Sequence, residues 1–502
     1  MPEINLQSPL LPSYEEPEEP EKSIKPAIIV AIASTWVATS LAAADSTITS
    51  TLSATIAHEF NSLALVSWLG TGYLIGLTAT QPLSGKLSDI FGRRVSFCFA
   101  TSMFTIGNLT CGFSHSQVTL IAARILTGIG GGGCISISTF ICSDNIPLNR
   151  RGLWQGIGAL VYTSGMGLGA VIGGLVNDHL GWRWAFIGIA PISLIATLGA
   201  ATFVPSHHEK GKKLGEMSSR VDFAGSVTLV SSLVLLMLGL NHEGPRIETP
   251  LFLTAIPLGL VLLVAFLYIE YKWAKEPIIP LSLFRRRTVV ATCLTAWFMS
   301  MAFFALSFYV PLYLQMLGYS TSETGLRLLP DSIGAGVGSF IVGLIIRITG
   351  KYGVFRYIMP LLLVIAALGF ALISTRTYWI LPEIYLLCKG FGMGGALTML
   401  ILALLHAVPH EKHATATSAY YAFRSTGSTL GLSVVSAIFN RQIQHASMGK
   451  GATCTEEDAC YLDALHDAFR LALGFACVGF ISALFVGNYT TKAHEENSEE
   501  SH

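Results

Sequence analysis

The chain has 502 residues, of which 52% are hydrophobic and only 12% are charged, and its 31 acidic residues balance its 31 lysines and arginines. Because soluble domains carry about 25% charged residues, this composition excludes an ordinary soluble enzyme. The balanced charge also excludes a nucleic-acid-binding protein, since it leaves no basic surface. The composition indicates instead a polytopic helical membrane protein, whose 49 glycines let helices approach closely.

The two ends of the chain are polar and acidic. Residues 1–26 contain Leu10-Leu11 followed by several glutamates, and residues 490–502 are similarly acidic. Such segments bury too little apolar surface to fold, so we expect both to be disordered tails. A Leu-Leu pair beside acidic residues can act as a sorting signal or can simply belong to a solvated tail.

Between the tails lie about fourteen segments that are long and apolar enough to cross a bilayer. They are expected at residues 27–44, 65–84, 95–113, 118–142, 153–176, 184–204, 223–240, 251–271, 288–314, 325–346, 354–374, 384–405, 415–439 and 469–489. The predicted fold is therefore an all-α polytopic membrane protein. It has a six-helix bundle over residues 27–204, a linker region with two extra membrane helices over residues 205–287, and a second six-helix bundle over residues 288–489.

Basic residues gather in alternate loops, at positions such as Arg93, Arg150, Lys212, Arg286 and Lys351. The positive-inside rule therefore predicts that these loops and both termini are cytosolic. Of the nine cysteines, seven lie within predicted spans, where they are expected to act as small apolar packing residues. Cys454 and Cys460 lie in the longest non-cytosolic loop, at residues 440–467. An oxidising compartment would allow a disulfide there, and the spacing alone does not decide it.

Asp45 follows the first predicted span, and an acid in a low-dielectric site can exchange protons near neutral pH or pair with a cationic substrate. If the helix continues through Ile48, Leu52 and Ile56, Asp45 lies in the middle of the membrane rather than at its surface. In the fourth span, Arg124 is a charge several residues inside the membrane, and such charges are costly and usually functional.

Asp331 and Arg424 are further charges within spans, and both are expected to face a cavity between the two halves. Lys389 occupies a position in the second half that resembles that of Arg124 in the first, with its glycines offset. Arg470 is near a span end, and its side chain is expected to reach the membrane surface. The run of glycines from Gly128 fits G-x-G-x-x-G, but it lies inside one apolar helix and not between a strand and a helix. We therefore reject a dinucleotide site.

The segment Gly85–Arg94 after the second span contains residues that can hold neighbouring helices together. Gly85 permits close helix contact, and Asp89 can accept hydrogen bonds from Arg93 or Arg94, or sit against the N-terminus of a neighbouring helix. With Gly92, these residues form a predicted gate that holds one conformation closed. A related pattern recurs at Gly343–Tyr352 after the tenth span, which indicates two repeated six-helix units.

The fifth span carries a glycine pattern with positions four residues apart. Such a face is flat and suits close packing, against either a static or a moving neighbouring helix. Its glycines are Gly156, Gly165, Gly169, Gly173 and Gly174. The chain contains no nucleotide-binding G-x-x-x-x-G-K-[ST] loop, so we expect an ion gradient rather than ATP to supply energy. No set of side chains completes a metal site, and no cofactor is expected.

These motifs together resemble the major facilitator superfamily, specifically its branch of fourteen-span drug:proton antiporters. Gly85–Arg94 resembles the loop motif of the superfamily. Arg124 with Gly128 and Gly130 resembles the motif of its fourth span, whose arginine is implicated in proton coupling. The glycines of the fifth span resemble the antiporter motif, with Ala170 where that motif normally has proline.

Within that branch, several segments resemble the fungal vacuolar basic amino acid transporters. They are Ala57–Ser62, Gln81–Asp89, Ala422–Gly427 and the Leu10-Leu11-Pro12 tail. The resemblance implies an antiporter of the vacuolar membrane that exchanges lysine, histidine or arginine for protons, and we expect it to be a monomer. We expect Asp45 to be the acid that exchanges protons or the partner of a substrate cation. Arg124 is expected to bias the pKa of that acid or to bind a carboxylate, and Arg424 to bind a carboxylate from the second half.

Two other functions fit the same sequence features. A plasma-membrane exporter of drugs or siderophores would differ in its location and in the drug sensitivity caused by its deletion. A nutrient sensor on the same fold would bind an amino acid without moving it, and such a sensor usually carries a long signalling tail. The short tails here argue against the sensor.

Overall fold

A computed structural model describes residues 26–205 except 63 and 147, residues 223–240 and 250–272, and residues 284–487 except 350, 375–377, 379, 409–412 and 451–458. Each of the fourteen predicted spans coincides with one helix or with a pair of consecutive helices. Ten helices in the described ranges meet length and hydropathy criteria for crossing a membrane. The predicted tails lie outside the described residues, apart from Pro26.

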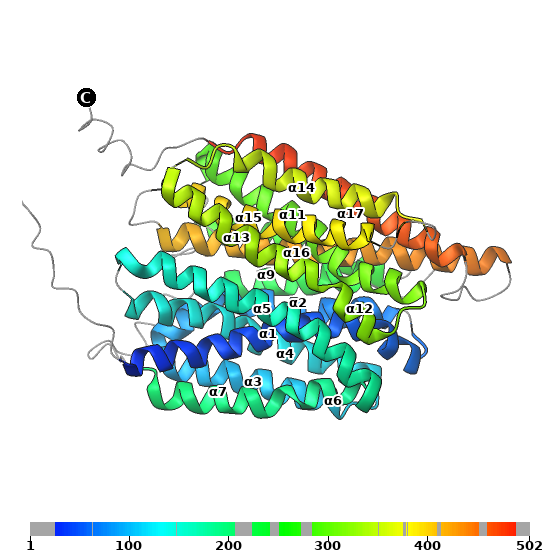
Figure 1. Ribbon diagram of the computed structural model, residues 1–502, viewed down its shortest axis with the longest axis horizontal. Coiled ribbons are helices and arrows are strands. Elements are labelled where there is room, and N and C mark those ends of the chain that lie inside the picture. The colour runs from blue at the N-terminus through cyan, green and yellow to red at the C-terminus, as the bar shows by residue number, and fades with distance from the viewer. Residues whose placement is uncertain are drawn as a thin grey trace, which may run out of the picture.

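The N-terminal helices are α1 (Pro26–Glu59), α2 (Ala64–Phe91), α3 (Arg93–Gly112), α4 (Gln117–Asn145), α5 (Leu148–Leu180), α6 (Trp182–Ile187) and α7 (Ile189–Phe203). The inserted helices are α9 (Phe223–Leu240) and α10 (Pro250–Lys272). The C-terminal helices are α11 (Arg287–Met316), α12 (Thr321–Arg327), α13 (Leu329–Thr349), α14 (Phe355–Ala371), α15 (Leu381–His406), α16 (His413–Lys450) and α17 (Ala459–Leu484). Figure 1 shows α1–α7 in the lower part of the molecule and α11–α17 in the upper part.

Each half has its own apolar core. One cluster of buried side chains runs from α1 to α7, and a second is built mainly from α11 to α17. Helix α9 touches both halves, because its Leu229 and Leu233 cluster with Ile75 of α2 and Leu430 of α16, and α10 packs against α9. The inserted pair therefore lies beside the place where α2 and α16 meet.

Glycines set the closest helix contacts in both halves. A Cβ atom at Gly128 of α4 would lie 2.0 Å from the carbonyl oxygen of Tyr73 in α2. A Cβ atom at Gly390 of α15 would lie 1.9 Å from the carbonyl oxygen of Asp331 in α13. The pairs α2/α4 and α13/α15 thus pack backbone against backbone, and only glycine permits this at these positions.

The expected end of the first span at Ala44 is wrong, because α1 continues to Glu59. Ile48, Leu52 and Ile56 extend its buried apolar stripe. Its hydroxyl side chains bond back to carbonyls of the same helix, as Thr49 does to Asp45 at 2.8 Å, so these polar residues do not end it. Asp45 therefore lies in the middle of a 34-residue helix.

The expected loop at residues 440–467 is also mostly helical, because α16 extends to Lys450 and α17 begins at Ala459. The rings of Phe439 and Tyr461 pack edge to face with centroids 5.5 Å apart, which anchors the two extended helix ends to each other. Cys460 is disulfide-bonded. Cys454, its predicted partner, lies outside the described residues, so this pairing stays a prediction.

Candidate functional site

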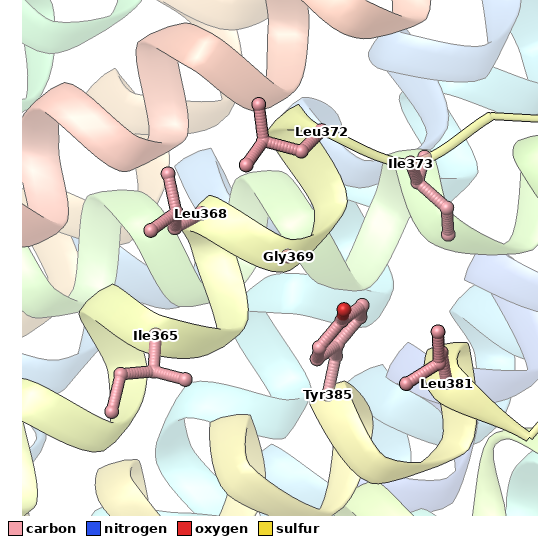
Figure 2. A pocket seen from close by; sticks show the side chains of 7 residues that line it. All are labelled: Ile365, Leu368, Gly369, Leu372, Ile373, Leu381 and Tyr385. Carbon is pink, nitrogen blue, oxygen red and sulfur yellow. The ribbon is translucent and has the colours of Figure 1, made fainter. Parts of the chain in front are cut away.

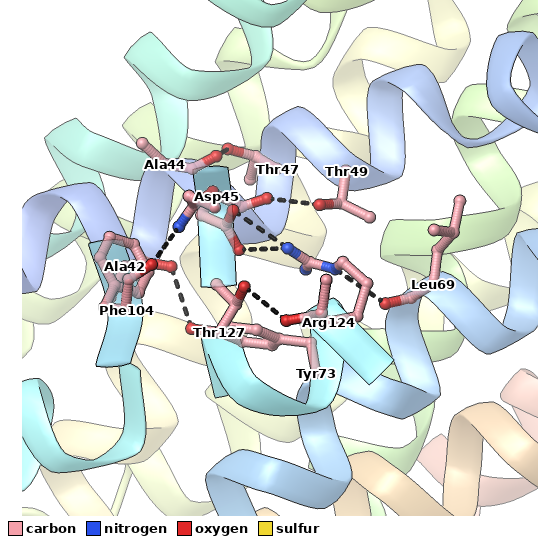
Figure 3. Close-up of polar contacts among 12 residues, drawn as sticks. Ala42, Ala44, Asp45, Thr47, Thr49, Leu69, Tyr73, Phe104, Arg124 and Thr127 are labelled. Atoms are coloured by element: carbon pink, nitrogen blue, oxygen red, sulfur yellow. Dashed lines mark hydrogen bonds and ion pairs between the residues drawn. The ribbon is translucent and has the colours of Figure 1, made fainter. Parts of the chain in front are cut away.

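Asp45 and Arg124 form an ion pair in the core of the N-terminal half (Figure 3). Helix α1 supplies Asp45 and helix α4 supplies Arg124. Arg124 Nη1 lies 3.0 Å from Asp45 Oδ1 and 2.8 Å from Oδ2, and neither side chain has any exposed surface. The sequence predicted both residues as functional charges within the membrane, and the structure brings them into direct contact.

The surroundings of Arg124 fix the position of its guanidinium group. Its Nε donates to the carbonyl of Leu69 at 3.2 Å, and the guanidinium lies 4.9 Å from the ring centroid of Tyr73. The Tyr73 hydroxyl in turn donates to the carbonyl of Ala42 at 3.1 Å. Among the described residues, Arg124 Nη2 has no hydrogen-bond partner, so the cation has spare donor capacity.

The chemistry of this pair follows from its two side chains. An arginine stays protonated in proteins, so Asp45 is the only member of the pair that can take up or release a proton. A buried charge left without a partner is costly. A proton that neutralises Asp45 would therefore favour the arrival of an anionic group at Arg124, and a substrate cation would compete with Arg124 for the carboxylate.

The C-terminal half contains a second buried ion pair, between Asp331 of α13 and Lys389 of α15. Lys389 Nζ lies 2.8 Å from Asp331 Oδ2 and 2.9 Å from Ser307 Oγ of α11. The ammonium also lies 4.3 Å from the ring centroid of Phe303. The sequence predicted Asp331 as a site residue but did not identify Lys389 as its partner. The position of Lys389 in the second half, which resembles that of Arg124 in the first, could have indicated it.

Arg424 of α16 is half-buried and forms no ion pair with any described residue. It interacts electrostatically with Tyr162 of α5 and with Tyr420 of its own helix. The structure thus keeps Arg424 apart from both carboxylates, Asp45 and Asp331.

The predicted gate Gly85–Arg94 forms a charge cluster within the N-terminal half. Arg93 lies 2.7 Å from Asp89 and 2.8 Å from Asp144, which joins the ends of α2 and α4. Gly92 has a φ of 85°, so it makes the turn between α2 and α3 that presents Arg93. A Cβ atom at Gly85 would lie 3.5 Å from the ring of Phe140. Arg94 makes no ion pair with another described residue.

The glycines of α5 face two different neighbours. A Cβ atom would lie 2.3 Å from Ser40 at Gly165, 2.5 Å from Ala44 at Gly169 and 3.2 Å from Ile48 at Gly173. These three therefore pack against α1, the helix that carries Asp45. Gly174 instead lies against Thr321 of α12 in the other half, and a Cβ atom at Gly156 would meet nothing within 4 Å. The pattern thus serves both packing within one half and contact between halves.

The two halves are in contact at the end of the molecule that carries Asp178. Asp178 Oδ2 accepts from the backbone N–H of Ser322 at 3.0 Å, and Asp178 also hydrogen-bonds the hydroxyl of Thr321. Nearby, Gln315 Nε2 donates to the carbonyl of Thr51 at 2.7 Å. Nothing in the sequence motifs pointed to Asp178, which lies just beyond the last glycine of α5.

A pocket of about 350 Å³ lies between α14 and α15 (Figure 2). Aliphatic side chains and Tyr385 line it, and Leu368 and Leu372 beside it are exposed on the outer surface. It contains none of the charged residues described above. An apolar depression on the outer face of a membrane helix suits lipid chains better than a polar substrate.

A bundle of membrane-length helices in two halves, with a buried charge pair in each half, is the architecture of a multi-pass membrane transporter. The sequence profile described as "Major Facilitator Superfamily" matches residues 35–432. The chain therefore belongs to the major facilitator superfamily, and it is a transporter rather than an enzyme.

Individual relatives narrow the comparison. The chain is 35% identical over 405 residues to "Multidrug resistance protein fnx1" of Schizosaccharomyces pombe, covering 80% of this chain and 76% of the relative. It is 32% identical over 392 residues to "Vacuolar basic amino acid transporter 2" of Saccharomyces cerevisiae, covering 75% and 82%. Its fold is similar to that of a bacterial homolog of the human lysosomal transporter Spinster, with a TM-score of 0.64 at 14% identity over 92% and 98% of the two chains.

Proposed function

We propose that this protein is a proton-coupled antiporter of the basic amino acids lysine, histidine and arginine in the vacuolar membrane. The observation that carries the proposal is the fully buried pair of Asp45 and Arg124. A carboxylate in such a pair can exchange a proton or a cation only when the charge of the whole site is balanced. This requirement links the movement of protons to that of a charged substrate.

In the proposed cycle, Asp45 holds a proton in one state and pairs with a cation in the other. When the substrate cation reaches Asp45 from the cytosol, the proton on the carboxyl group leaves to the cytosol, and a proton from the lumen displaces the substrate after the site has opened to the lumen. Arg424 is proposed to receive the substrate carboxylate from the second half, because it is half-buried and has no carboxylate partner among the described residues. The site would thus contact both charged groups of an amino acid.

The contacts between the halves support alternating access. They include Asp178 with the N-terminus of α12 at one end and, further inward, Thr78 with Thr429 at 3.0 Å. At the other end, the ion pairs of Arg93 stay within the N-terminal half. We propose that the Arg93 end and both termini are cytosolic, and that this conformation is closed toward the vacuolar lumen. Rocking one half against the other would then open the Asp178 end.

The likeness to a vacuolar basic amino acid transporter supports the proposed substrate class and membrane. The direct test is uptake of labelled lysine, arginine and histidine into liposomes that contain the purified protein, with and without an imposed pH gradient. We expect uptake that requires the gradient and collapses with a protonophore. The variant Asp45→Asn should lose gradient-driven uptake while it still folds and inserts.

A matched control separates this effect from a general loss of charge. Asp467→Asn also removes one acid, but the Asp467 side chain is 25% exposed and pairs with Arg470 of α17, which is 66% exposed. This control should transport like the unmodified protein. Full gradient-driven uptake by Asp45→Asn would remove Asp45 from the mechanism, and absence of uptake by the folded unmodified protein would overturn the proposed substrate.

A second candidate is a proton-coupled exporter of drugs or siderophores in the plasma membrane. The likeness to a protein described as a multidrug resistance protein favours it. The two candidates differ in location, so a tagged protein on the cell surface, together with drug sensitivity after deletion, would support the exporter. Tagged protein on the vacuole, together with lower vacuolar content of basic amino acids after deletion, would support the antiporter.

A further inference from the structure

The ion pair of Asp331 and Lys389 differs chemically from the pair of Asp45 and Arg124. Arginine does not release its proton in proteins, whereas a buried lysine changes its protonation state readily. Lys389 has no exposed surface, and its ammonium is held by one carboxylate oxygen, one hydroxyl group and the face of one ring. Either member of this second pair can therefore lose or gain a proton.

Asp331 has an acceptor that the pair does not use. Its Oδ2 contacts Lys389, while its Oδ1 is buried and has no hydrogen-bond partner among the described residues. A buried polar atom without a partner is unfavourable, and such atoms are rare in folded proteins. Oδ1 is therefore a ready acceptor for a cationic group that enters beside the pair.

The pair lies next to the contact between the halves. Ser332, the residue after Asp331, faces Gly167 of α5, where a Cβ atom would lie 3.1 Å from Ser332 Cβ. Phe308 follows Ser307 on α11, and its ring packs against Gly70 of α2 in the other half. A Cβ atom at Gly70 would lie only 2.5 Å from that ring. If the halves separate at these contacts, Ser332 and Phe308 become exposed. These two residues are the sequence neighbours of Asp331 and Ser307.

We propose that Asp331, Lys389 and Ser307 form a second cation-exchange site, at which a substrate ammonium group replaces the ammonium of Lys389 on Asp331. This inference rests on the proposed function and extends it. As the substrate ammonium binds Asp331, one N–H bond of Lys389 Nζ breaks, the neutral amine stays beside Ser307, and the proton leaves through water in the opened cavity. The site then still holds one positive and one negative charge.

Few other charged side chains lie on the helices around Asp331 and Lys389. Among the described residues, Asp331 and Lys389 form an ion pair only with each other. The next charges on α12 and α15 are Arg327 and Glu383, which pair with each other at 2.5 Å. Helix α11 contributes the neutral Ser307 and Phe303, and α5 contributes Gly167. The site therefore exchanges one proton for one cation without a third charge to absorb the difference.

The test counts protons released when L-lysine binds to the purified full-length protein in weakly buffered detergent solution, with a pH indicator and labelled lysine. The double variant Asp331→Asn/Lys389→Gln should release about one proton fewer per lysine bound, because neither side chain then has a proton to lose. Lys389→Gln alone is not used for this count, since the buried Asp331 without its partner takes up a proton itself. Lys389→Arg should bind lysine about tenfold more weakly or worse, since a guanidinium group cannot yield its place by deprotonation.

Matched controls keep each outcome decisive. The double variant Asp331→Asn/Lys389→Gln removes both charges at once, so it should fold better than Asp331→Asn alone and should bind cations weakly. An unchanged proton count in Asp331→Asn/Lys389→Gln, or unchanged lysine affinity in Lys389→Arg, would overturn the exchange site while the proposed function stands. Tetraphenylphosphonium serves as a second probe. If the unmodified protein binds it but not lysine, the amino acid substrate is wrong, and the proton count with this probe still decides the site.

Discussion

Replacing Asp45 by asparagine leaves the guanidinium of Arg124 buried without a counter-charge. Both side chains of the pair have 0% exposed surface, so water cannot compensate for the loss. The same argument applies in reverse to Arg124→Gln, which leaves a buried carboxylate. The double variant Asp45→Asn/Arg124→Gln removes both charges and keeps two amides that can hydrogen-bond each other.

The expected magnitudes follow from this burial. Breaking a buried ion pair by removing one partner costs about 3–5 kcal/mol, whereas replacing both partners is often nearly neutral. Each single variant should therefore lower the free energy of unfolding by about 3–5 kcal/mol, and the double variant should lower it by less than either single variant. The pair of Arg93 and Asp144 is the comparison. Its side chains are 24% and 49% exposed, so removing one partner should cost about 1 kcal/mol or less.

The assay is unfolding by dodecyl sulfate in mixed micelles, followed by the fluorescence of the 8 tryptophans. All four proteins of each double-mutant cycle are measured under the same conditions, so that the coupling free energy between the two side chains is obtained directly. Additive effects of Asp45→Asn and Arg124→Gln would refute the reasoning, because they would mean that each charge finds compensation without the other.

Three further predictions concern Gly169, Asp178 and Gly92. Gly169→Val should reduce uptake at least about tenfold, because a Cβ atom there would lie 2.5 Å from the backbone of Ala44, and overpacking costs about 1–3 kcal/mol, while Gly156→Ala should transport normally. Asp178→Asn should increase the population open at that end about tenfold, measured by spin-label distances across the end, since hydrogen bonds to a charged group contribute about 1.5–3 kcal/mol; an unchanged distance distribution would contradict this. Gly92→Ala should lower the free energy of unfolding by about 1–3 kcal/mol in the dodecyl sulfate assay, because a φ of 85° with a ψ of 148° is a backbone conformation that essentially only glycine adopts.

The number and order of the spans could be predicted from the sequence, because hydropathy over about 20 residues is a local property. The ends of the helices were less predictable. α1 continues through Asp45, Thr47 and Thr49 since their polar groups are satisfied inside the protein, by Arg124 and by backbone carbonyls. A hydropathy pattern does not show that satisfaction, so it ended the span too early.

The sequence by itself determined the class of this protein and the identity of its costly charges. Low charge, long apolar segments, repeated motifs and the intramembrane residues Asp45, Arg124 and Asp331 are all visible in the chain. Only the tertiary structure decided which charge neutralises which. Asp45 and Arg124 are 79 residues apart, and Asp331 and Lys389 are 58 residues apart. Their pairing depends on how neighbouring helices are rotated and how closely glycines let them approach, and these properties arise only when the helices pack.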